Sequence, residues 1–466
     1  MGLERLREEL QRTGIPVEHL APEKKRVYLV GGCIRDALLG RHIVDFDFVV
    51  EDSGINYAED LARKVGGRFV PLKLDEGRVV YKRSLVLDFS GLGTRKIEDD
   101  LRDRDFTINA MAVELQDLLH ARWRILDPCS GMEDLSSKVI RTVAEDSLVK
   151  DPVRLLRAFR FASELDFVIE GNTMNALKLH RDLIRGVAGE RISYELKLIL
   201  QSDASWKQVD EMGEVSLLVT LFPELREMDT LLPEIELLTH SIASLRELEG
   251  LLSGTRESID RLKPWSASYF HWKHRKPLLK LATLLHDIGK PNTLSSDKKG
   301  RVHFYGHDML GEKLLHPILK ERLRLSNAEV EAITRLVRYH MRPHLLGREE
   351  ELTPRAMRRF FADLEEEWVG VLLLAYADAL ASENGDVSNL ESLITQLVEF
   401  KEETEKKGKV ERLIDGSDLI GELQLEPGPI FRKILERVEE EQLEGKVRTK
   451  EEALELVREM LKQGEG

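Results

Sequence analysis

Residues 27–50, VYLVGGCIRDALLGRHIVDFDFVV, predict how the chain begins to fold. Apolar runs rich in β-branched residues lie on both sides of Gly31 and Gly32, a pattern typical of strands joined through a turn. We therefore expect a strand, a Gly-Gly turn, a short helix and a second strand, with further short strands between residues 68 and 89. From about residue 149, apolar residues recur every three or four positions, which predicts helices. The fold class expected is α+β, with a sheet-containing head followed by an all-helical chain.

The composition limits the kind of protein this can be. The chain has 466 residues, of which 42% are hydrophobic and 33% charged, and its formal net charge is −14. Such a length is sufficient for two or more domains. The longest apolar run, residues 369–377, is far shorter than the roughly 20 residues of a membrane-spanning helix, and residues 1–10 lack a secretory hydrophobic segment. Only Cys33 and Cys129 are present, which excludes a disulfide framework. We expect a cytoplasmic protein with no membrane partner.

Changes of pattern along the chain predict four parts. We expect a head at residues 22–147, a helical neck at 148–205, a helical body at 206–400 and a helical tail at 401–466. Nine of the 13 histidines lie between His240 and His344, inside the body. This clustering suggests a second chemistry in addition to that of the head.

Three carboxylates of the head are candidate metal ligands. Asp45 and Asp47 are two residues apart, so on a strand both would project from the same face. Asp88, in the predicted strand RSLVLDFSG, is the third candidate. Three converging carboxylates can hold two Mg²⁺ ions that activate an attacking hydroxyl and stabilise a departing pyrophosphate. The turn at Gly31 and Gly32 would let backbone N–H groups approach a triphosphate. The alternative is a simple turn beside a solvated strand face.

Several motifs resemble the class II tRNA nucleotidyltransferases and bacterial poly(A) polymerases of the polymerase-beta superfamily. LVGGCIRDALLGR followed by Asp45-Phe46-Asp47 resembles their catalytic signature, and DRDFTINAMA at residues 103–112 their second motif. DPVRLLRAFRFASEL at 151–165 resembles their base-reading helix, and GERISYEL at 189–196 their neck motif. The resemblance implies a polymerase-beta-like head with a mixed sheet, then an all-α neck, an HD domain and a tail that grips tRNA. It also implies template-independent nucleotide transfer to an RNA 3′ end, with Mg²⁺ held by Asp45, Asp47 and Asp88.

The same resemblance implies a nucleotide-binding set. Its members in the head are Gly31, Gly32, Arg35, Arg104, Asp105 and Asn109. For Arg104, Asp105 and Asn109 the alternative is hydrogen bonding at the end of a strand. Asp151, Arg154, Arg157 and Arg160 follow at intervals of three, which places neighbours on one face of a helix. A carboxylate beside a guanidinium can pair with the Watson–Crick edge of cytosine or adenine, and the resemblance assigns this role to Asp151 and Arg154. Arg157 and Arg160 would steady the helix or the triphosphate. The alternative for Asp151, which precedes Pro152, is a helix N-cap.

The segment between Asp88 and Arg104 bears on which nucleotides are added. It is shorter than in family members that add both C and A, and resembles that of variants that add only CC. Switching from C to A requires a movement for which that loop is the lever. We therefore favour CC addition from CTP, with a separate A-adding enzyme acting afterwards. The alternatives are full CCA addition or A addition with ATP. A poly(A) polymerase is less favoured because a strongly basic RNA surface is expected there and this chain is acidic.

The body carries a motif similar to the HD phosphohydrolase signature. LATLLHDIGKP places His286 beside Asp287, and an imidazole and a carboxylate can both reach one metal ion. The candidate ligand set is His240, His286, Asp287, His307, His340 and Asp378. A divalent metal, whether Mg²⁺, Mn²⁺ or Ni²⁺, could there support hydrolysis of a phosphate ester. The alternatives are a helical body that only shapes the RNA cradle, and a phosphohydrolase whose head merely binds nucleotide or RNA. The remaining histidines of the body, His344 among them, are expected to be structural.

Overall fold

The computed structural model describes residues 2–22, 25–43, 45–72, 75–82, 85–230, 236–254, 260–272, 274–382, 384–407, 412–443 and 446–462. The chain divides into two compact units, which are described separately. Unit 1 comprises Met1–Leu238 and Pro317–Ser326, and unit 2 comprises Thr239–His316 and Asn327–Gly466. In the described ranges, no helix is both long and apolar enough to cross a membrane.

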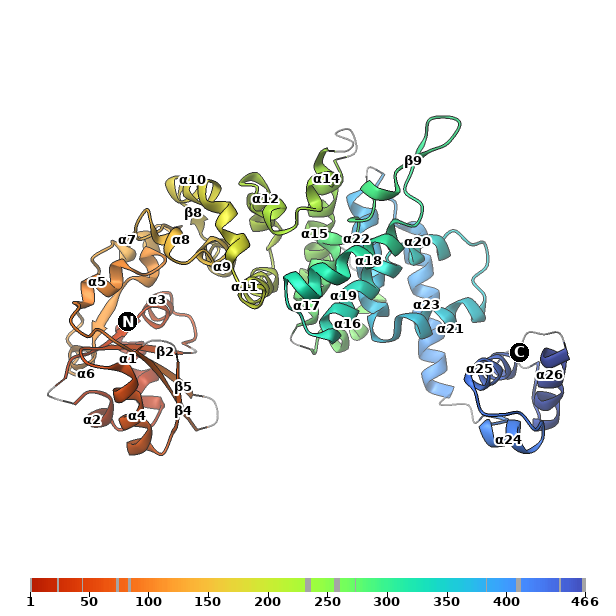
Figure 1. The fold of residues 1–466 in the computed structure, drawn as a ribbon, viewed down its shortest axis with the longest axis horizontal. Helices are drawn as coiled ribbons and strands as arrows, with labels where there is room; N and C mark the ends of the chain where they lie inside the picture. The colour runs from red at the N-terminus through yellow and green to blue at the C-terminus, as the bar shows by residue number, and fades with distance from the viewer. Residues whose placement is uncertain are drawn as a thin grey trace. The chain divides into compact units, whose positions relative to one another are not determined.

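The head of unit 1 is built around a mixed sheet (red to orange in Figure 1). Among the described residues it has six strands in the order β3-β4-β5-β2-β1-β6. Their bounds are β1 Val27–Val30, β2 Phe46–Val50, β3 Arg68–Pro71, β4 Glu76–Tyr81, β5 Leu85–Gly91 and β6 Ala112–Glu114. β2 and β5 are parallel, and the other neighbours are antiparallel. The predicted strands are thus confirmed, although Arg83 and Ser84 of the third predicted strand lie outside the described residues.

Helices cover both faces of this sheet. Phe48 and Phe89 stack at 4.8 Å, and Tyr57 of α4 lies 5.2 Å from Phe89. On the other face, Tyr28, Val30 and Val49 pack with Ile97 and Leu101 of α5. The helical elements of the head are α1 Gly2–Arg12, α2 Val17–Leu20, α3 Gly32–Leu38, α4 Gly54–Val65, α5 Ile97–Arg102, η1 Thr107–Asn109, α6 Leu115–Leu119 and α7 Gly131–Ser136. Burial on both faces explains why the central strands are almost continuously apolar.

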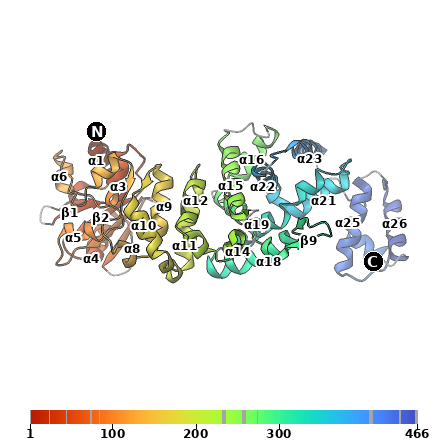
Figure 2. The same ribbon diagram turned by 90° about the horizontal axis from the view of Figure 1, so that it is seen from above.

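The helical neck follows the head within unit 1. Its elements are α8 Ser147–Lys150, α9 Arg154–Leu165, α10 Gly171–His180, η2 Arg181–Gly186, α11 Gly189–Gln201, α12 Trp206–Glu214, α13 Leu217–Leu221 and α14 Leu225–Thr230. Two short strands, β7 Val139–Ile140 and β8 Val168–Ile169, pair beside them. α9 packs against α11 and α12 (Figure 2). The apolar face of α9 therefore lies in the neck core.

Unit 2 is almost entirely helical. Its body contains α15 Leu237–Ser253, η3 Asp260–Leu262, α16 Lys263–Tyr269, α17 Arg275–Leu285, η4 Pro291–Thr293, α18 His307–Pro317, α19 Asn327–Tyr339, α20 Arg342–Leu346, α21 Pro354–Leu364, η6 Glu365–Glu367, α22 Trp368–Ala381 and α23 Ser388–Lys407. β9 Ser295–Ser296 pairs with β10 Val302–His303. A short π-helical turn, Ile318–Arg322, follows α18 and belongs to unit 1. The long apolar run of the sequence forms α22, which is buried almost all round. A helix that is apolar on every side belongs in a core.

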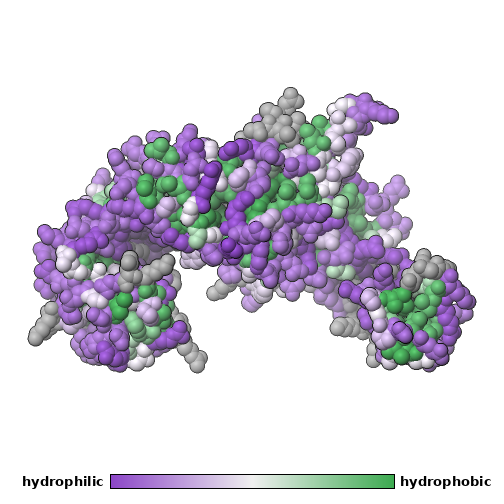
Figure 3. All heavy atoms as spheres, in the orientation of Figure 1, coloured by the Kyte–Doolittle hydropathy of each residue, from purple (hydrophilic) through white to green (hydrophobic). Residues whose placement is uncertain are grey.

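The C-terminal helices have a core of their own. α24 Gly416–Gly421, α25 Pro429–Leu443 and α26 Lys450–Lys462 bury Leu419, Ile434 and Val457 against one another. On the face shown in Figure 3, hydrophobic residues also reach the surface of these helices, and Ile420 is 48% exposed. α23 runs across residue 400, where the sequence predicts a boundary between body and tail.

A buried ion pair joins α15 to α17. The Lys280 Nζ lies 2.7 Å from the Glu249 Oε1, and the two side chains are 0% and 3% exposed. Replacing Lys280 by Met should lower the free energy of unfolding by about 3–5 kcal/mol, because the buried Glu249 carboxylate would lose the ammonium 2.7 Å away. Urea unfolding followed by fluorescence measures the change. The double variant Lys280→Met/Glu249→Leu should recover most of the loss, and a fully stable single variant would contradict the prediction.

Candidate functional site

The Gly-Gly turn lies against two charged side chains of the head. Gly31 has φ +75°, a conformation that favours glycine. A Cβ there would lie 2.9 Å from the Arg104 guanidinium and 3.6 Å from the Asp47 Oδ2. Gly31 is therefore required both by the backbone and by the close approach of these groups. Gly32 starts α3, whose first N–H groups point away from the helix body.

The predicted carboxylates come together at the start of β2. Asp47 is directly in register with Asp88 on the parallel strand β5. Asp45 is exposed and lies just before β2 rather than on it. Burial raises the pKa of Asp47, and the charges of Asp88 and Asp45 raise it further against the opposing charge of Arg104. Carboxylate oxygens that repel one another suit a hard divalent cation.

Arg78 is a residue of this site that the sequence reasoning missed. It lies on β4 in register with Asp88. Its Nε and NH2 donate to the two carboxylate oxygens of Asp88 at 2.7 and 2.8 Å. The hydrogen bond with Asp88 raises the pKa of Arg78. This pairing orients Asp88 and balances part of its charge. It depends on strand register, for which the local sequence carries no signal.

The second motif links the head to the neck through hydrogen bonds. Asn109 Nδ2 donates to Asp105 Oδ1 at 3.1 Å, and Arg35 NH1 donates to Asn109 Oδ1 at 2.7 Å. Arg157 of α9 contacts Asp105 Oδ2 through Nε at 2.7 Å and NH2 at 2.6 Å. Burial would raise the pKa of Asp105, but Arg157 and Asn109 lower it overall. Arg35, Asn109 and Asp105 thus form a buried chain that fixes α9 to the head.

Arg104 and Arg160 pair with different carboxylates. Arg104 Nε donates to Asp100 Oδ2 at 3.1 Å, which holds its guanidinium beside Gly31. Arg160 Nε lies 2.8 Å from Glu195 Oε2 of α11, and its guanidinium stacks 4.2 Å from the Phe161 ring centroid. Glu195 was not among the predicted residues, although it belongs to the neck motif. Arg157 and Arg160 therefore steady the packing of α9 on the head and on α11.

The base-reading pair is placed differently from the sequence expectation. α9 begins at Arg154, and Asp151, which precedes Pro152, accepts the Arg154 N–H with its backbone carbonyl at 3.0 Å, as an N-cap residue does. Asp151 follows α8 in an extended conformation, with φ −145°. Its carboxylate is instead bound by Arg191 of α11, at 3.0 and 2.8 Å. Asp151 is therefore not on the helical face that Arg154 shares with Arg157.

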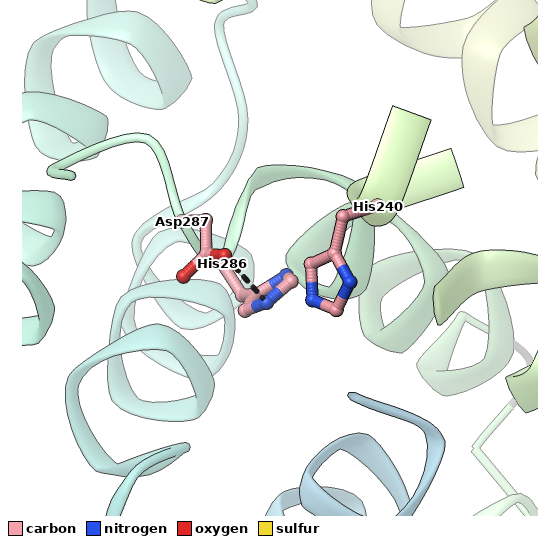
Figure 4. Close-up of side chains that lie close together, drawn as sticks. All are labelled: His240, His286 and Asp287. Carbon is pink, nitrogen blue, oxygen red and sulfur yellow. Dashed lines mark ion pairs between the residues drawn. The ribbon is translucent and has the colours of Figure 1, made fainter. Parts of the chain in front are cut away.

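In unit 2 the predicted histidines and aspartates converge in one buried cluster. His240, His286 and Asp287 each offer a ligand atom, and these atoms all lie within 4.8 Å of one another (Figure 4). Asp287, His307 and His340 form a second group by the same measure. Asp378 of α22 contacts His240 Nε2 at 2.8 Å and His286 Nε2 at 3.4 Å. Asp287 belongs to both groups, so it is placed to bridge two ions.

Hydrogen bonds fix the orientation of three of these imidazoles. The Nδ1 atoms of His286, His307 and His340 lie 2.6–2.7 Å from the backbone carbonyls of Thr283, Phe304 and Val337. Nδ1 must therefore carry the proton when the ring is neutral, which leaves the Nε2 lone pair free to bind a metal. The Nε2 atoms of His307 and His340 nevertheless face each other at 3.1 Å. Two facing lone pairs repel, so the cluster fits a cation between them.

Two further residues join this cluster. His344, which was expected to be structural, contacts a predicted ligand, because its Nε2 lies 3.1 Å from Asp378 Oδ2. Its spacing of four from His340 was the signal that could have identified it. Lys290 Nζ lies 2.5 Å from Asp287 Oδ2. Lys290 belongs to the same HDIGK motif and places a positive charge beside the carboxylate.

Burial and neighbouring charges shift the pKa values of two histidines in this cluster. Burial lowers the pKa of His286, but Asp287 and Asp378 outweigh it and raise the value to about 10. Burial and the neighbouring His286 lower the pKa of His340 to about 3. His340 is therefore neutral at physiological pH, which is the form in which an imidazole can bind a metal ion.

Four family models match parts of the chain from residue 27 to residue 457, and two of the matches overlap. The Poly A polymerase head domain matches residues 27–89 and 74–141, and the "Probable RNA and SrmB-binding site of polymerase A" matches 166–229. The HD domain matches residues 239–368, and tRNA nucleotidyltransferase domain 2 matches 309–457.

Two curated relatives align along almost their full length. The A-adding tRNA nucleotidyltransferase of Deinococcus radiodurans is 32% identical, with 93% of this chain and 95% of the relative covered. The CC-adding tRNA nucleotidyltransferase of Thermus thermophilus is 31% identical, with 92% of each covered. This chain belongs to the tRNA nucleotidyltransferase family. The family that the motifs resemble and the predicted enzyme class are thereby confirmed.

The fold of this tRNA nucleotidyltransferase is also that of solved CCA-adding enzymes. A CCA-adding enzyme in complex with CTP superimposes with a TM-score of 0.67 at 23% identity, covering 98% of this chain and 97% of the other. The Thermotoga maritima CCA-adding enzyme complexed with tRNA gives a TM-score of 0.64 at 24% identity, covering 97% and 96%. These similarities confirm the predicted fold class.

Proposed function

We propose that this protein adds nucleotides to the 3′ end of tRNA without a nucleic-acid template, using CTP and releasing pyrophosphate. The observation that carries the proposal is the register of Asp47 beside Asp88, next to the Gly31 turn, in the same unit as Asp151 and Arg154. Names of the full-length relatives support the substrate, since both are tRNA nucleotidyltransferases.

Asp45, Asp47 and Asp88 would hold the divalent ion, and the all-oxygen set favours Mg²⁺. When bound there, such an ion would lower the pKa of the attacking 3′ hydroxyl and neutralise charge on the pyrophosphate. Arg104 lies beside Asp47 and the Gly31 turn, where it can bind a phosphate oxygen. Arg78 keeps the Asp88 oxygens oriented. The buried chain from Arg35 to Arg157 holds this end of the head against α9.

Base choice follows from the order of donors and acceptors. The carboxylate of Asp151 accepts hydrogen bonds, and the guanidinium of Arg154 donates them. Cytosine and adenine both present an amino donor next to a ring-nitrogen acceptor, which suits this pair. Uracil and guanine present a carbonyl oxygen next to a ring N–H. The Asp151 carboxylate would then face another acceptor, and the Arg154 guanidinium would face another donor. The pair thus supports acceptance of C and A and rejection of U and G.

The short connection after Asp88 supports CC addition. β5 ends at Gly91 and α5 begins at Ile97, which leaves residues 92–96 as the only irregular part of the connection. Arg95 pairs with Asp103, and Asp103 Oδ1 contacts Lys150 Nζ of α8 at 2.9 Å. Ion pairs hold the far end of this short connection. The connection is therefore poorly able to move, as the change from adding C to adding A requires. A separate enzyme would then add the A.

Three tRNA substrates test this proposal, ending before CCA, after the first C and after CC. Each is incubated with Mg²⁺ and labelled CTP or ATP, separately and together. Two added C residues with refusal of ATP on the CC-ended substrate are expected. A complete CCA end would contradict CC specificity, long A tails would indicate a poly(A) polymerase, and no incorporation would contradict the proposal as a whole.

The facing imidazoles of unit 2 favour a second candidate function, metal-dependent phosphohydrolysis. The residues that would hold divalent ions are His240, His286, Asp287, His307, His340 and Asp378, and Asp287 belongs to both ligand groups. A set rich in imidazole favours Mn²⁺ or Ni²⁺ over Mg²⁺. Such a centre can activate water against a phosphate ester such as a 2′,3′-cyclic phosphate at an RNA end. Metal content after dialysis and hydrolysis of a 2′,3′-cyclic phosphate test it, and a metal-free, inactive protein after incubation with Mn²⁺, Ni²⁺ or Mg²⁺ would contradict it.

A further inference from the structure

The neck helix α11 holds one of the two proposed base-reading side chains. Arg191, in its first turn, binds Asp151 with two hydrogen bonds, from NH1 to Oδ1 at 3.0 Å and from NH2 to Oδ2 at 2.8 Å. A guanidinium that binds both oxygens of a carboxylate fixes its plane as well as its position. The side chains of Arg191 and Asp151 are 53% and 33% exposed, so a nucleotide can reach them.

Arg154, the other base-reading side chain, is held by a different set of groups. Its NH1 donates to the Arg104 carbonyl at 3.2 Å and to the Ser147 Oγ at 2.9 Å, and its NH2 donates to the Asp103 carbonyl at 2.8 Å. These partners belong to the head and to α8. Asp151, the acceptor of the pair, is therefore held by α11. Arg154, the donor, is held by α8 and by the residues that precede η1.

We propose that Arg191 is a specificity-determining positioning residue, which fixes the Asp151 carboxylate so that it accepts a hydrogen bond only from the amino group of the incoming base. The inference rests on the proposed function. A carboxylate has about four lone-pair sites, and the guanidinium occupies two of them. The direction of the remaining sites stays fixed as long as Arg191 is bound.

Loss of Arg191 would weaken rejection of uracil in two ways. A released carboxylate can rotate away from the uracil O4 that it would otherwise repel. A carboxyl that gains a proton can also donate a hydrogen bond to that O4. Burial raises the pKa of Asp151, but its hydrogen bond with Arg191 lowers the pKa overall. The guanidinium therefore preserves both the direction and the charge of the acceptor.

The contact is dedicated to Asp151. Among the described residues, no other acidic side chain forms an ion pair with Arg191. Exposed ion pairs contribute little to stability, so removal of this guanidinium should leave the fold intact. A role confined to the fold would then produce no visible effect, whereas a role in base choice changes the relative use of nucleotides.

Single-nucleotide incorporation into a tRNA lacking its CCA end tests the inference, with CTP and UTP compared for the wild type and for Arg191→Ala. The ratio of kcat/KM for CTP to that for UTP should fall about 10- to 100-fold, in line with the loss of a charge-assisted hydrogen bond. KM for CTP should rise more than kcat falls. Arg191→Lys, which keeps the charge without the two-pronged geometry, should recover part of the ratio.

Arg185→Ala is the matched control, because Arg185 is an exposed neck arginine paired with Asp182 at 3.1 Å. Its CTP to UTP ratio should equal that of the wild type. A wild-type ratio in Arg191→Ala, with both nucleotides slowed alike, would overturn the inference while leaving the proposed function intact. A wild type that incorporates no CMP would overturn both. For a variant too slow to time, equilibrium binding of CTP and UTP supplies the same ratio.

Discussion

Replacing Asp47 by Asn should lower the rate of nucleotide addition by about 10³-fold or more. The variant keeps the shape of the side chain but removes the negative charge that would hold Mg²⁺ beside Asp88, and metal stabilisation of this kind contributes several kcal/mol to the transition state. Incorporation of labelled CMP into tRNA measures the change.

The same variant should not lose stability. Burial and the neighbouring carboxylates raise the pKa of Asp47, which means that its ionised form is disfavoured in the folded protein. A raised pKa implies that ionisation at neutral pH costs folding free energy, so the neutral amide relieves repulsion and the melting temperature should stay level or rise. Loss of activity together with unfolding would contradict this account.

Asp52→Asn is the control for Asp47. Asp52 follows the same strand but is exposed and pairs with Lys25 at 2.8 Å. Its amide variant should add CMP at the wild-type rate. Phosphate-ester hydrolysis should also be unchanged in Asp47→Asn, because the histidine cluster lies in the other unit. Full nucleotide addition by Asp47→Asn would exclude it as a metal ligand.

Replacing Asp287 by Asn should abolish metal binding in unit 2 and lower phosphate-ester hydrolysis by about 10³-fold or more. Asp287 is the residue common to both ligand groups, with Oδ1 at 3.5 Å from His307 Nε2 and Oδ2 at 3.2 Å from His286 Nε2. An amide supplies a weaker ligand and no charge to offset two cations. Metal content by elemental analysis and hydrolysis of a 2′,3′-cyclic phosphate are the measurements.

Nucleotide addition should stay within about twofold of the wild type in Asp287→Asn, since the carboxylates of the head are untouched. Asp297→Asn is the control, because Asp297 lies between β9 and β10 and pairs with Arg301 at 2.8 Å. That variant should keep its metal and its hydrolysis. If Asp287→Asn lost nucleotide addition as well, the two sites would not be independent.

Local patterns were reliable where a short stretch specifies its own conformation. Gly31 needs its positive φ, and Phe46 and Phe48 alternate with Asp47 as a half-buried strand requires. The HD pair and its partner residues were also found from the sequence, since six predicted ligands do converge. The base-reading helix was predicted to open at Asp151, and α9 begins at Arg154, directly after a turn in which Asp151 accepts the Arg154 N–H.

The sequence by itself therefore determined the α+β head, the helical remainder, the family and most members of both candidate sites. Tertiary structure alone decided that Arg78 pairs with Asp88, that Arg191 holds Asp151 and that His344 joins Asp378. The physical reason is that propensity and periodicity act over a few residues, whereas these contacts join separate elements. Asp151 and Arg191, 40 positions apart in the chain, meet only because α11 packs against α9.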